Sequence, residues 1–530
     1  MRSTTANAWR HCFSIDAERA CIGIDPLRQL AGERTGFTGL IPVVARIVYT
    51  WRLFFTSSRV NMSKKTRGLK DKAIPRSLSV SLAGIRAGGL LAMDSAVQRV
   101  LRRDSDAEES EFARREARRF VRELGKLKGT YVKIGQMLAM FGEQFLPAVL
   151  VDALRDLADQ TEPLHWDALE SFVRDSLGER FEELEIDPEA IAAASLAQVH
   201  LAKIVATGEW ICIKVQYPGL ADVIDSDFDA VVRMLLLARW VKAGRDLDAW
   251  LESMRSHLHH EIDYRREAAL TAQMAELVRG IEVSGVTYHV PRIHTEFCTD
   301  TVLAMEYIEG HSVTEPEVAS LSQERRNALA KGMLELFFYE LYDWGFLQTD
   351  PNFGNYLLRL QDRRLRLARD ELVLLDFGSV LDCSPEFLHY LRETIAAGQQ
   401  QDVTGLVHGL IGLGCLQPDA SDEGRKMFAD FCLHLLEPLR APDKLPAEYL
   451  NDRGEYCWAR SRLMRRAGKQ AAVSATSRHF TPPSRDFALI ARKLTGVFNF
   501  IAVLEAEFNA YEMIESHIAR WRERERSGGK

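Results

Sequence analysis

The sequence predicts an α+β protein with two lobes and additional helices at both ends. Three observations lead to this fold class: an apolar β-hairpin pattern near residue 200, long helical patterns on either side of it, and a polar loop before a buried-type strand after Phe346. At 530 residues the chain exceeds one compact core, so two or three structural units are expected.

Composition and charge narrow the class of protein. A hydrophobic content of 46% with 27% charged residues is ordinary for a globular protein, and a net charge of −7 argues against a nucleic-acid binder. The eight cysteines include no C-x-x-C pair, which fits a reducing compartment better than a zinc site or a disulfide framework. We therefore expect a cytoplasmic protein without a nucleic-acid partner.

Residues 1–74 are interpreted as a variable N-terminal segment. Its most apolar stretch, Phe37 to Phe55, contains Arg46 and Arg52, which disfavour a membrane-spanning helix. We favour an uncovered hydrophobic helix here over one lying at a membrane interface. A lysine-rich start, M-S-K-K-T-R, begins at Met62, so the native chain beginning at Met62 is an open alternative.

Residues 75–165 are predicted to be helical. An apolar stripe at steps of three and four consists of Phe120, Leu124, Leu127, Tyr131, Ile134 and Leu138. Pro147 ends or kinks this pattern. Lys133 and Gln136 lie off the stripe, where spacing alone predicts solvated side chains, and Gly135 between them lets another backbone come close.

The next unit, residues 166–310, begins with a β-hairpin. One strand is predicted over residues 191–205, then a turn at Thr207–Glu209, then a strand that contains Lys214. A charge within an apolar strand needs a partner or a ligand, so a function for Lys214 is favoured over a side chain that reaches solvent.

A helical region is predicted from Asp222 to about Leu277. His257, His259 and His260 lie in it, and we interpret them as part of a solvated helix face, not as metal ligands. Two strands follow, and the second leads into a connector at Glu306–Gly310.

The C-terminal half, divided into residues 311–440 and 441–530, contains the most informative stretch. After an amphipathic helix from Ser322, Asp350 and Asn355 stand five positions apart, and Asp376 lies in an Asp-Phe-Gly triplet after an apolar run. Phosphoryl transfer from a magnesium nucleotide requires this arrangement: Asp350 beside the attacking oxygen, with Asn355 and Asp376 on Mg²⁺. An Asx-rich turn beside a hairpin would leave the rest of the chain unexplained.

The N-terminal hairpin supplies the other half of a nucleotide site. Lys214 would reach the α- and β-phosphates of ATP or ADP, and a helix glutamate would orient it. A small-residue loop, with Ala193, Ala194 and Ser195, takes the place of the glycine-rich loop of protein kinases. The edge of the adenine pocket is expected at Met305, Glu306 and Tyr307, where the second strand leads into the connector.

Together these motifs resemble the UbiB/AarF family of atypical kinases. They are K-I-G-Q at Lys133, A-A-A-S-L-A-Q-V-H from Ala192, I-C-I-K at Lys214, E-I-D-Y-R-R-E-A from Glu261, D-P-N-F-G-N at Asp350, and D-F-G. They stand in the family's order over roughly residues 75–400.

The resemblance implies a two-lobed protein-kinase-like fold, with an N-terminal helical extension over the active site and extra C-terminal helices. It implies that Lys133 and Gln136 face Glu261 and Asp263, where this extension regulates access to the site. It also implies that Glu267 pairs with Lys214, and that Asp350 is the catalytic-loop aspartate.

The catalytic loop departs from the family's common H-A-D-P-H-P-G-N. Gln348, Thr349, Asn352 and Phe353 occupy the variable places, and Ala197 replaces the usual glycine of the S-x-G-Q-V-H run. Asp350 and Asn355 are retained, so the departure affects acceptor recognition more than metal binding.

By this resemblance the chain is an ATP-dependent phosphotransferase or ATPase in coenzyme Q or related isoprenoid-lipid metabolism. Peripheral contact with membrane lipid or with lipid-biosynthesis proteins is implied. A nucleotide-gated scaffold for a lipid-metabolic complex is the alternative, and a true protein kinase is less favoured.

Overall fold

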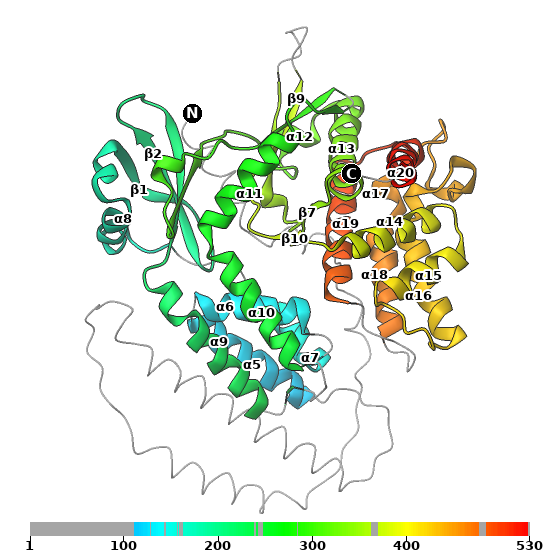
Figure 1. Ribbon diagram of the computed structural model, residues 1–530, viewed down its shortest axis with the longest axis horizontal. Coiled ribbons are helices and arrows are strands. Elements are labelled where there is room, and N and C mark those ends of the chain that lie inside the picture. The colour runs from blue at the N-terminus through cyan, green and yellow to red at the C-terminus, as the bar shows by residue number, and fades with distance from the viewer. Residues whose placement is uncertain are drawn as a thin grey trace, which may run out of the picture.

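The computed structural model describes residues 111–527, except 128, 143–144, 156, 158–162, 238–239, 242–246, 284, 362–368 and 476–483. The predictions for Phe37–Phe55 and for a start at Met62 lie outside the described residues. Helices and strands combine in two lobes, with further helices before the first lobe and after the second (Figure 1), which confirms the predicted α+β class. Among the described helices, none has the length and apolar character that crossing a membrane requires.

The N-terminal helices are α5 (Glu111–Leu127), α6 (Thr130–Phe141) and α7 (Ala148–Arg155). The apolar stripe predicted as one helix is divided between α5 and α6, because Gly129 has a φ of 62° and a left-handed residue cannot continue an α-helix. The apolar faces of these helices pack with α9 (Leu220–Leu237) and α10 (Leu247–Glu261) into a core of their own (Figure 1).

An antiparallel sheet of order β1-β2-β3-β6 forms the first lobe. Its strands are β1 (Leu184–Ala193), β2 (Ala197–Ile204), β3 (Trp210–Gln216) and β6 (Val302–Glu306), with α8 (Glu170–Leu177) beside them. The predicted hairpin is formed by β2 and β3, which pair antiparallel on either side of the predicted turn. Residues 191–193, at the start of the predicted strand, belong to β1 instead. The chain turns between β1 and β2, where the Ala194 N–H donates to the Ala197 carbonyl at 2.8 Å.

Helix α11 (Tyr264–Leu277) faces the sheet from the side of β6. The side chain of Asp263 caps it by accepting a hydrogen bond from the Arg266 N–H at 2.9 Å. This cap separates α11 from α10, so the predicted helical region consists of three helices.

The second lobe begins with α12 (Pro316–Ala319) and α13 (Gln323–Phe338), and α13 continues into a π-helix over Tyr339–Trp344. Two small sheets hold the catalytic stretch, of order β10-β7 and β4-β5-β9-β8. Their strands are β4 (Glu282–Val283), β5 (Val286–His289), β7 (Phe346–Gln348), β8 (Tyr356–Arg359), β9 (Asp370–Leu374) and β10 (Val380–Asp382).

The remaining helices share one large core with the second lobe. They are α14 (Pro385–Gln399), α15 (Val403–Gly412), α16 (Asp422–Leu435), α17 (Trp458–Ser461), α18 (Leu463–Ala475), α19 (Arg485–Val503) and α20 (Tyr511–Arg526). Proline-containing 3₁₀ turns lie between α16 and α17, at the expected boundary between residues 311–440 and 441–530. Helix α19 packs on α13 and on α17 and α18, which places it beside the catalytic loop (Figure 1).

Candidate nucleotide site

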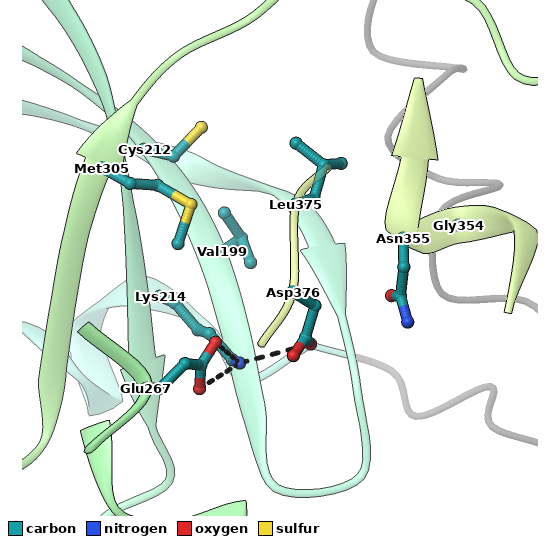
Figure 2. Close-up of a pocket in the computed structure, with 9 residues that line it drawn as sticks. All are labelled: Val199, Cys212, Lys214, Glu267, Met305, Gly354, Asn355, Leu375 and Asp376. Carbon is teal, nitrogen blue, oxygen red and sulfur yellow. Dashed lines mark hydrogen bonds and ion pairs between the residues drawn. The ribbon is translucent and has the colours of Figure 1, made fainter. Parts of the chain in front are cut away.

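The strand lysine meets two carboxylates. Lys214 Nζ lies 2.8 and 3.0 Å from the two carboxylate oxygens of Glu267, and 3.8 Å from Asp376 Oδ2 (Figure 2). Burial disfavours the charged lysine, but the nearby carboxylates of Glu267 and Asp376 outweigh it and raise the pKa of Lys214 well above its ordinary value. Lys214 is therefore a fixed cation, and Glu267 holds it in place.

A pocket between the lobes opens beside this lysine. It has an apolar part and a polar part, formed by Val199, Cys212, Met305 and Leu375 on the apolar side and by Lys214, Glu267, Gly354, Asn355 and Asp376 on the polar side. Cys212 and Met305 are paired across neighbouring strands β3 and β6. The pocket thus has an apolar part suited to a base and a charged end suited to phosphates.

The catalytic loop orients its asparagine through Asp350. Asn355 Nδ2 donates to Asp350 Oδ2 at 2.9 Å and to the Asp350 carbonyl at 3.2 Å. The amide nitrogen is therefore used, and the amide oxygen is the atom that can meet a cation. Asp376 Oδ1 accepts from the Gly378 N–H at 2.8 Å. An amide oxygen and a carboxylate are ligands that Mg²⁺ prefers.

Arg492 is a site residue that the sequence analysis missed. It lies on α19, 142 residues from Asp350, and its Nη2 is 3.3 Å from Asp350 Oδ1. Its Nη1 donates to the sulfur of Met140 on α6, so one guanidinium joins Asp350 to the N-terminal helices. The only signal in the sequence was a pair of adjacent basic residues, Arg492 and Lys493, inside an apolar helix.

Other predicted residues lie near the pocket without lining it. Ser195 is buried, and the Ala194 carbonyl accepts from Tyr217 Oη at 3.0 Å. In the connector, the Glu306 N–H donates to the Arg292 carbonyl and the Tyr307 N–H to the Trp210 carbonyl, so both N–H groups are used within the fold. The pocket is lined by Met305 of β6, but not by the other predicted residues, which are Glu306, Tyr307, Ala193, Ala194 and Ser195.

Helix α6 is tied to α10 by an ion pair. Lys133 Nζ lies 2.6 Å from Glu261 Oε1, and both side chains are largely buried, so the solvated position that spacing alone predicted for Lys133 is wrong. Gln136 is half-buried on the same helix. A Cβ on Gly135 would come within 2.3 Å of Leu157 Cδ1, so the neighbour that needs this glycine is a leucine side chain and not the predicted backbone.

The histidines of α10 differ from one another. His259 is half exposed and contacts Asp225, as a solvated face predicts. His257 is only 12% exposed and lies 3.7 Å from Glu261, so the solvated interpretation is wrong for it. Burial, together with the positive charges of Lys133 and Arg485, lowers the pKa of His257 to about 4.

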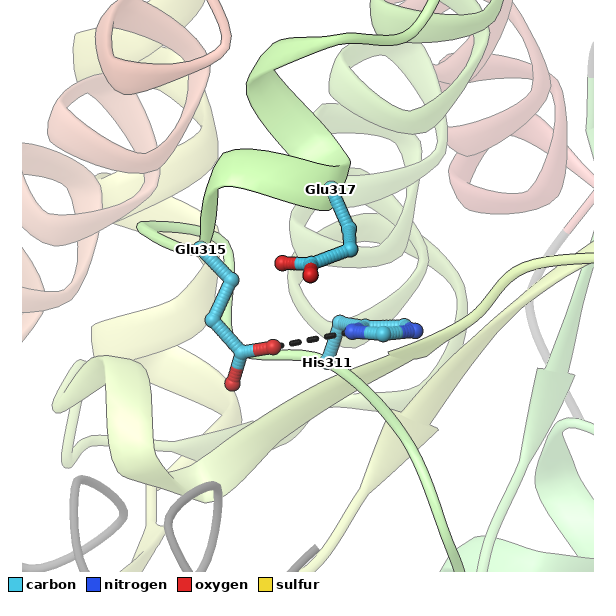
Figure 3. Close-up of side chains that lie close together, drawn as sticks. All are labelled: His311, Glu315 and Glu317. Carbon is cyan, nitrogen blue, oxygen red and sulfur yellow. Dashed lines mark hydrogen bonds and ion pairs between the residues drawn. The ribbon is translucent and has the colours of Figure 1, made fainter. Parts of the chain in front are cut away.

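Among the described residues, three side chains after the connector lie close enough to hold a cation. The ligand atoms of His311, Glu315 and Glu317 lie within 4.8 Å of one another (Figure 3). Ordinary contacts explain this group: His311 Nδ1 lies 2.8 Å from Glu315 Oε2, and the Ser312 N–H donates to Glu315 Oε1 at 3.1 Å. We assign no ion to it.

A strand lysine held by a helix glutamate, opposite a D-x4-N loop and a DFG aspartate, is the arrangement of a protein-kinase-like nucleotide pocket. Residues 156–409 match the ABC1 atypical kinase-like domain. Residues 156–409 are thus an ABC1 atypical kinase-like domain, which supports the resemblance of the chain to the UbiB/AarF family of atypical kinases.

Known relatives extend over most of the chain. It is 25% identical over 403 residues to the mitochondrial atypical kinase COQ8 of Saccharomyces cerevisiae, covering 76% of each protein. It is 26% identical over 470 residues to the mitochondrial atypical kinase COQ8B of Rattus norvegicus, covering 87% of this chain and 84% of that one. Among solved structures, that of the Rv3197–erythromycin complex of Mycobacterium tuberculosis matches with a TM-score of 0.51 at 21% identity, covering 77% of this chain and 97% of that one, and shares the fold.

Proposed function

We propose that the chain binds ATP with Mg²⁺ in the pocket between the lobes and acts as an atypical kinase or ATPase. In this proposal Lys214 binds the α- and β-phosphates and Glu267 orients it. Asn355 and Asp376 hold the cation, and Asp350 orients the attacking water or hydroxyl group. Most of the rate would come from positioning and from stabilisation of the transferring charge.

One observation carries the proposal. Lys214 Nζ, 2.8 Å from Glu267, shares a pocket with the carboxylate of Asp376 and the amide of Asn355. A bound magnesium nucleotide would supply the phosphoryl group and neutralise its charge. The chain contributes a fixed cation, Lys214, and the side-chain oxygens of Asn355 and Asp376 to the polar part of the pocket, where the phosphates would lie.

We further infer that this activity serves coenzyme Q or related isoprenoid-lipid metabolism, at or near a membrane surface. The family resemblance supports this, as do the relatives named COQ8 and COQ8B. An ATPase assay with and without anionic liposomes and quinone-precursor phenols tests it. We expect stimulation by liposomes or phenols in the wild type and no activity in Asp376→Asn; hydrolysis that neither addition changes would contradict the lipid role.

A second candidate is a nucleotide-gated scaffold for a lipid-metabolic complex, in which turnover is incidental. The contact of Arg492 Nη2 with Asp350 Oδ1 at 3.3 Å favours the scaffold. In this contact the guanidinium occupies one carboxylate oxygen of Asp350, the residue that would otherwise orient an attacking hydroxyl group. The link from Arg492 to α6 also disfavours docking of a protein acceptor, so a true protein kinase is the least supported reading.

Complementation in cells separates catalysis from gating. Asp350→Asn removes the proposed acceptor-orienting carboxylate and Lys214→Ala removes the phosphate ligand. If catalysis is required, both variants fail. If Asp350→Asn complements fully and Lys214→Ala does not, the scaffold replaces the enzyme as the proposed function.

A further inference from the structure

A second buried lysine lies on the side of the catalytic loop that faces α19. Lys493 is 1% exposed, and its Nζ lies 3.2 Å from Glu340 Oε2, 3.1 Å from Gln348 Oε1 and 3.2 Å from Tyr356 Oη. These partners belong to the π-helix after α13, to β7 and to β8. A buried ammonium is costly unless it is paired and hydrogen-bonded, so this site holds three elements in one arrangement.

Gln348 passes this constraint to the catalytic loop. It is 3% exposed, and its Nε2 donates to the Asp350 carbonyl at 2.8 Å and to the Asp376 carbonyl at 3.3 Å. Lys493 has donors and no acceptor, so the Gln348 oxygen must face it. The amide nitrogen must then face the two carbonyls. Lys493 therefore fixes the orientation of the Gln348 side chain, whose amide nitrogen contacts the backbone carbonyls of both Asp350 and Asp376.

Helix α19 contacts the loop at neighbouring positions as well. Besides the contact of Arg492 with Asp350, a Cβ on Gly496 would come within 2.0 Å of Pro351 Cβ, so the helix and the loop are in direct contact. The partner Glu340 lies in a π-helix, a rare backbone form that is common at functional sites.

We propose that Lys493 is a positioning residue that, through Gln348, sets the place of Asp350 relative to Asp376 for phosphoryl transfer. The inference rests on the proposed ATP-dependent function. Lys493 touches neither pocket nor nucleotide; it determines where the acceptor-orienting carboxylate stands. A displacement of about 1 Å at such a group costs about 100-fold in rate.

Lys493→Met is the variant of choice, because it keeps most of the length of the unbranched side chain and removes its donors. Burial already raises the pKa of Glu340 to about 7, so without the lysine this carboxyl group can take up a proton instead of remaining as an unpaired charge. The double variant Lys493→Met/Glu340→Gln removes the remaining charge and gives a second protein in which the lysine donors are absent.

The matched control is a similar buried pair that does not contact the catalytic loop. In the C-terminal helices Glu437 binds Arg466 at 2.7 Å and accepts from Tyr456 Oη at 2.7 Å. Glu437→Gln weakens this pair. It should lower stability to a similar degree and leave turnover unchanged.

The experiment compares ATP hydrolysis by these proteins and by Gln348→Leu. We expect kcat of Lys493→Met to fall about 100-fold while KM for ATP changes less than about threefold, and the double variant to behave alike. Gln348→Leu should lower kcat similarly, and combining it with Lys493→Met should add little, because both changes break one chain of hydrogen bonds. Equal kcat in Lys493→Met and Glu437→Gln, or fully additive losses with Gln348→Leu, would overturn the inference.

A wild type that binds magnesium ATP without hydrolysing it would refute the proposed catalysis, and hydrogen exchange would then decide the positioning role. Lys493→Met should speed amide exchange over residues 346–356, whereas Glu437→Gln should not. Equal exchange in the two variants would overturn the inference independently of any activity.

Discussion

Two buried lysine–glutamate pairs flank the catalytic stretch, and they differ in what else the lysine can reach. Lys214 is 17% exposed, and besides Glu267 it faces a pocket that also contains Asp376. Lys493 is 1% exposed, and Glu340, Gln348 and Tyr356 surround its ammonium group. The first lysine can still meet an anion from outside, whereas the second has its donors taken up inside the protein.

This difference separates two uses of a buried charge. A lysine at the wall of a pocket gains from a ligand that brings negative charge, and its carboxylate partner keeps it oriented until the ligand arrives. A lysine closed off by its own fold gains nothing from a ligand and can only hold structure. Burial and ion pairing alone therefore do not indicate a binding residue; access from a cavity does.

The largest expected effect comes from replacing Lys214, the lysine that faces the pocket. Lys214→Met leaves Glu267 buried without its partner, so we expect a loss of about 3 kcal/mol in the free energy of unfolding, together with the loss of nucleotide binding. Adding Glu267→Gln should restore much of the stability and none of the binding. Urea unfolding and titration with ATP measure the two effects; recovered binding in the double variant would contradict a phosphate-binding role for Lys214.

Asp376→Asn tests the proposed binding of Mg²⁺ in the pocket that Lys214 faces. We expect the affinity for magnesium ATP to fall at least about 100-fold, because a neutral amide is a weaker Mg²⁺ ligand than a carboxylate. Thermal shift with ATP, with and without Mg²⁺, measures this. Asp443→Asn, at a side chain 74% exposed, is the control and should behave as wild type. Unchanged magnesium-dependent protection in Asp376→Asn would remove it from the site.

Gly135→Ala tests the packing of α6, the helix that Arg492 contacts through Met140. The new Cβ would lie 2.3 Å from Leu157 Cδ1, so we expect a loss of about 2 kcal/mol in stability. Leu157→Ala in the same chain should relieve the clash and leave a smaller loss than the two single changes predict together. Gly468→Ala on α18, which meets nothing within 4 Å, is the matched control and should be neutral or slightly stabilising.

The smallest effect is a pH dependence beside the Lys133–Glu261 pair. The pKa of His257 is lowered to about 4 by burial, so between that value and about 6.5 the unfolded chain binds a proton that the folded chain does not. The free energy of unfolding therefore decreases as the pH is lowered below about 6.5. We expect a decrease of about 1 kcal/mol between pH 7 and pH 5.5. Unfolding at both pH values in wild type and His257→Gln measures it. An equal drop in both proteins would show that other groups titrate.

Lys214, Asn355 and Asp376 could be placed together in advance because each lies in a local motif. Lys214 stands out as a charge in an apolar strand, and Asp350, Asn355 and Asp376 lie within one short stretch with fixed spacing. Local spacing survives folding, because a strand or a tight loop fixes which residues can share a ligand.

The rest could not be predicted, because it depends on distant segments meeting. Lys493 looks ordinary in the sequence, since lysine is common in helices, and only the packing of α19 on the catalytic loop removes it from water. His257 likewise belongs to a run of polar residues whose burial depends on where α6 lies.

The sequence by itself determined the α+β class and the kinase-like motifs, and of its predicted nucleotide-site residues only Lys214, Glu267, Met305, Asn355 and Asp376 line the pocket. Only the tertiary structure decided that a further strand, β1, precedes the predicted hairpin, that Gly129 breaks the N-terminal helix, and that Arg492 and Lys493 of α19 contact the stretch around Asp350. The physical reason is that periodicity and motif spacing encode neighbours along the chain. Burial of a charge is set by partners far away along it, and for Lys493 those partners lie 137 to 153 residues distant.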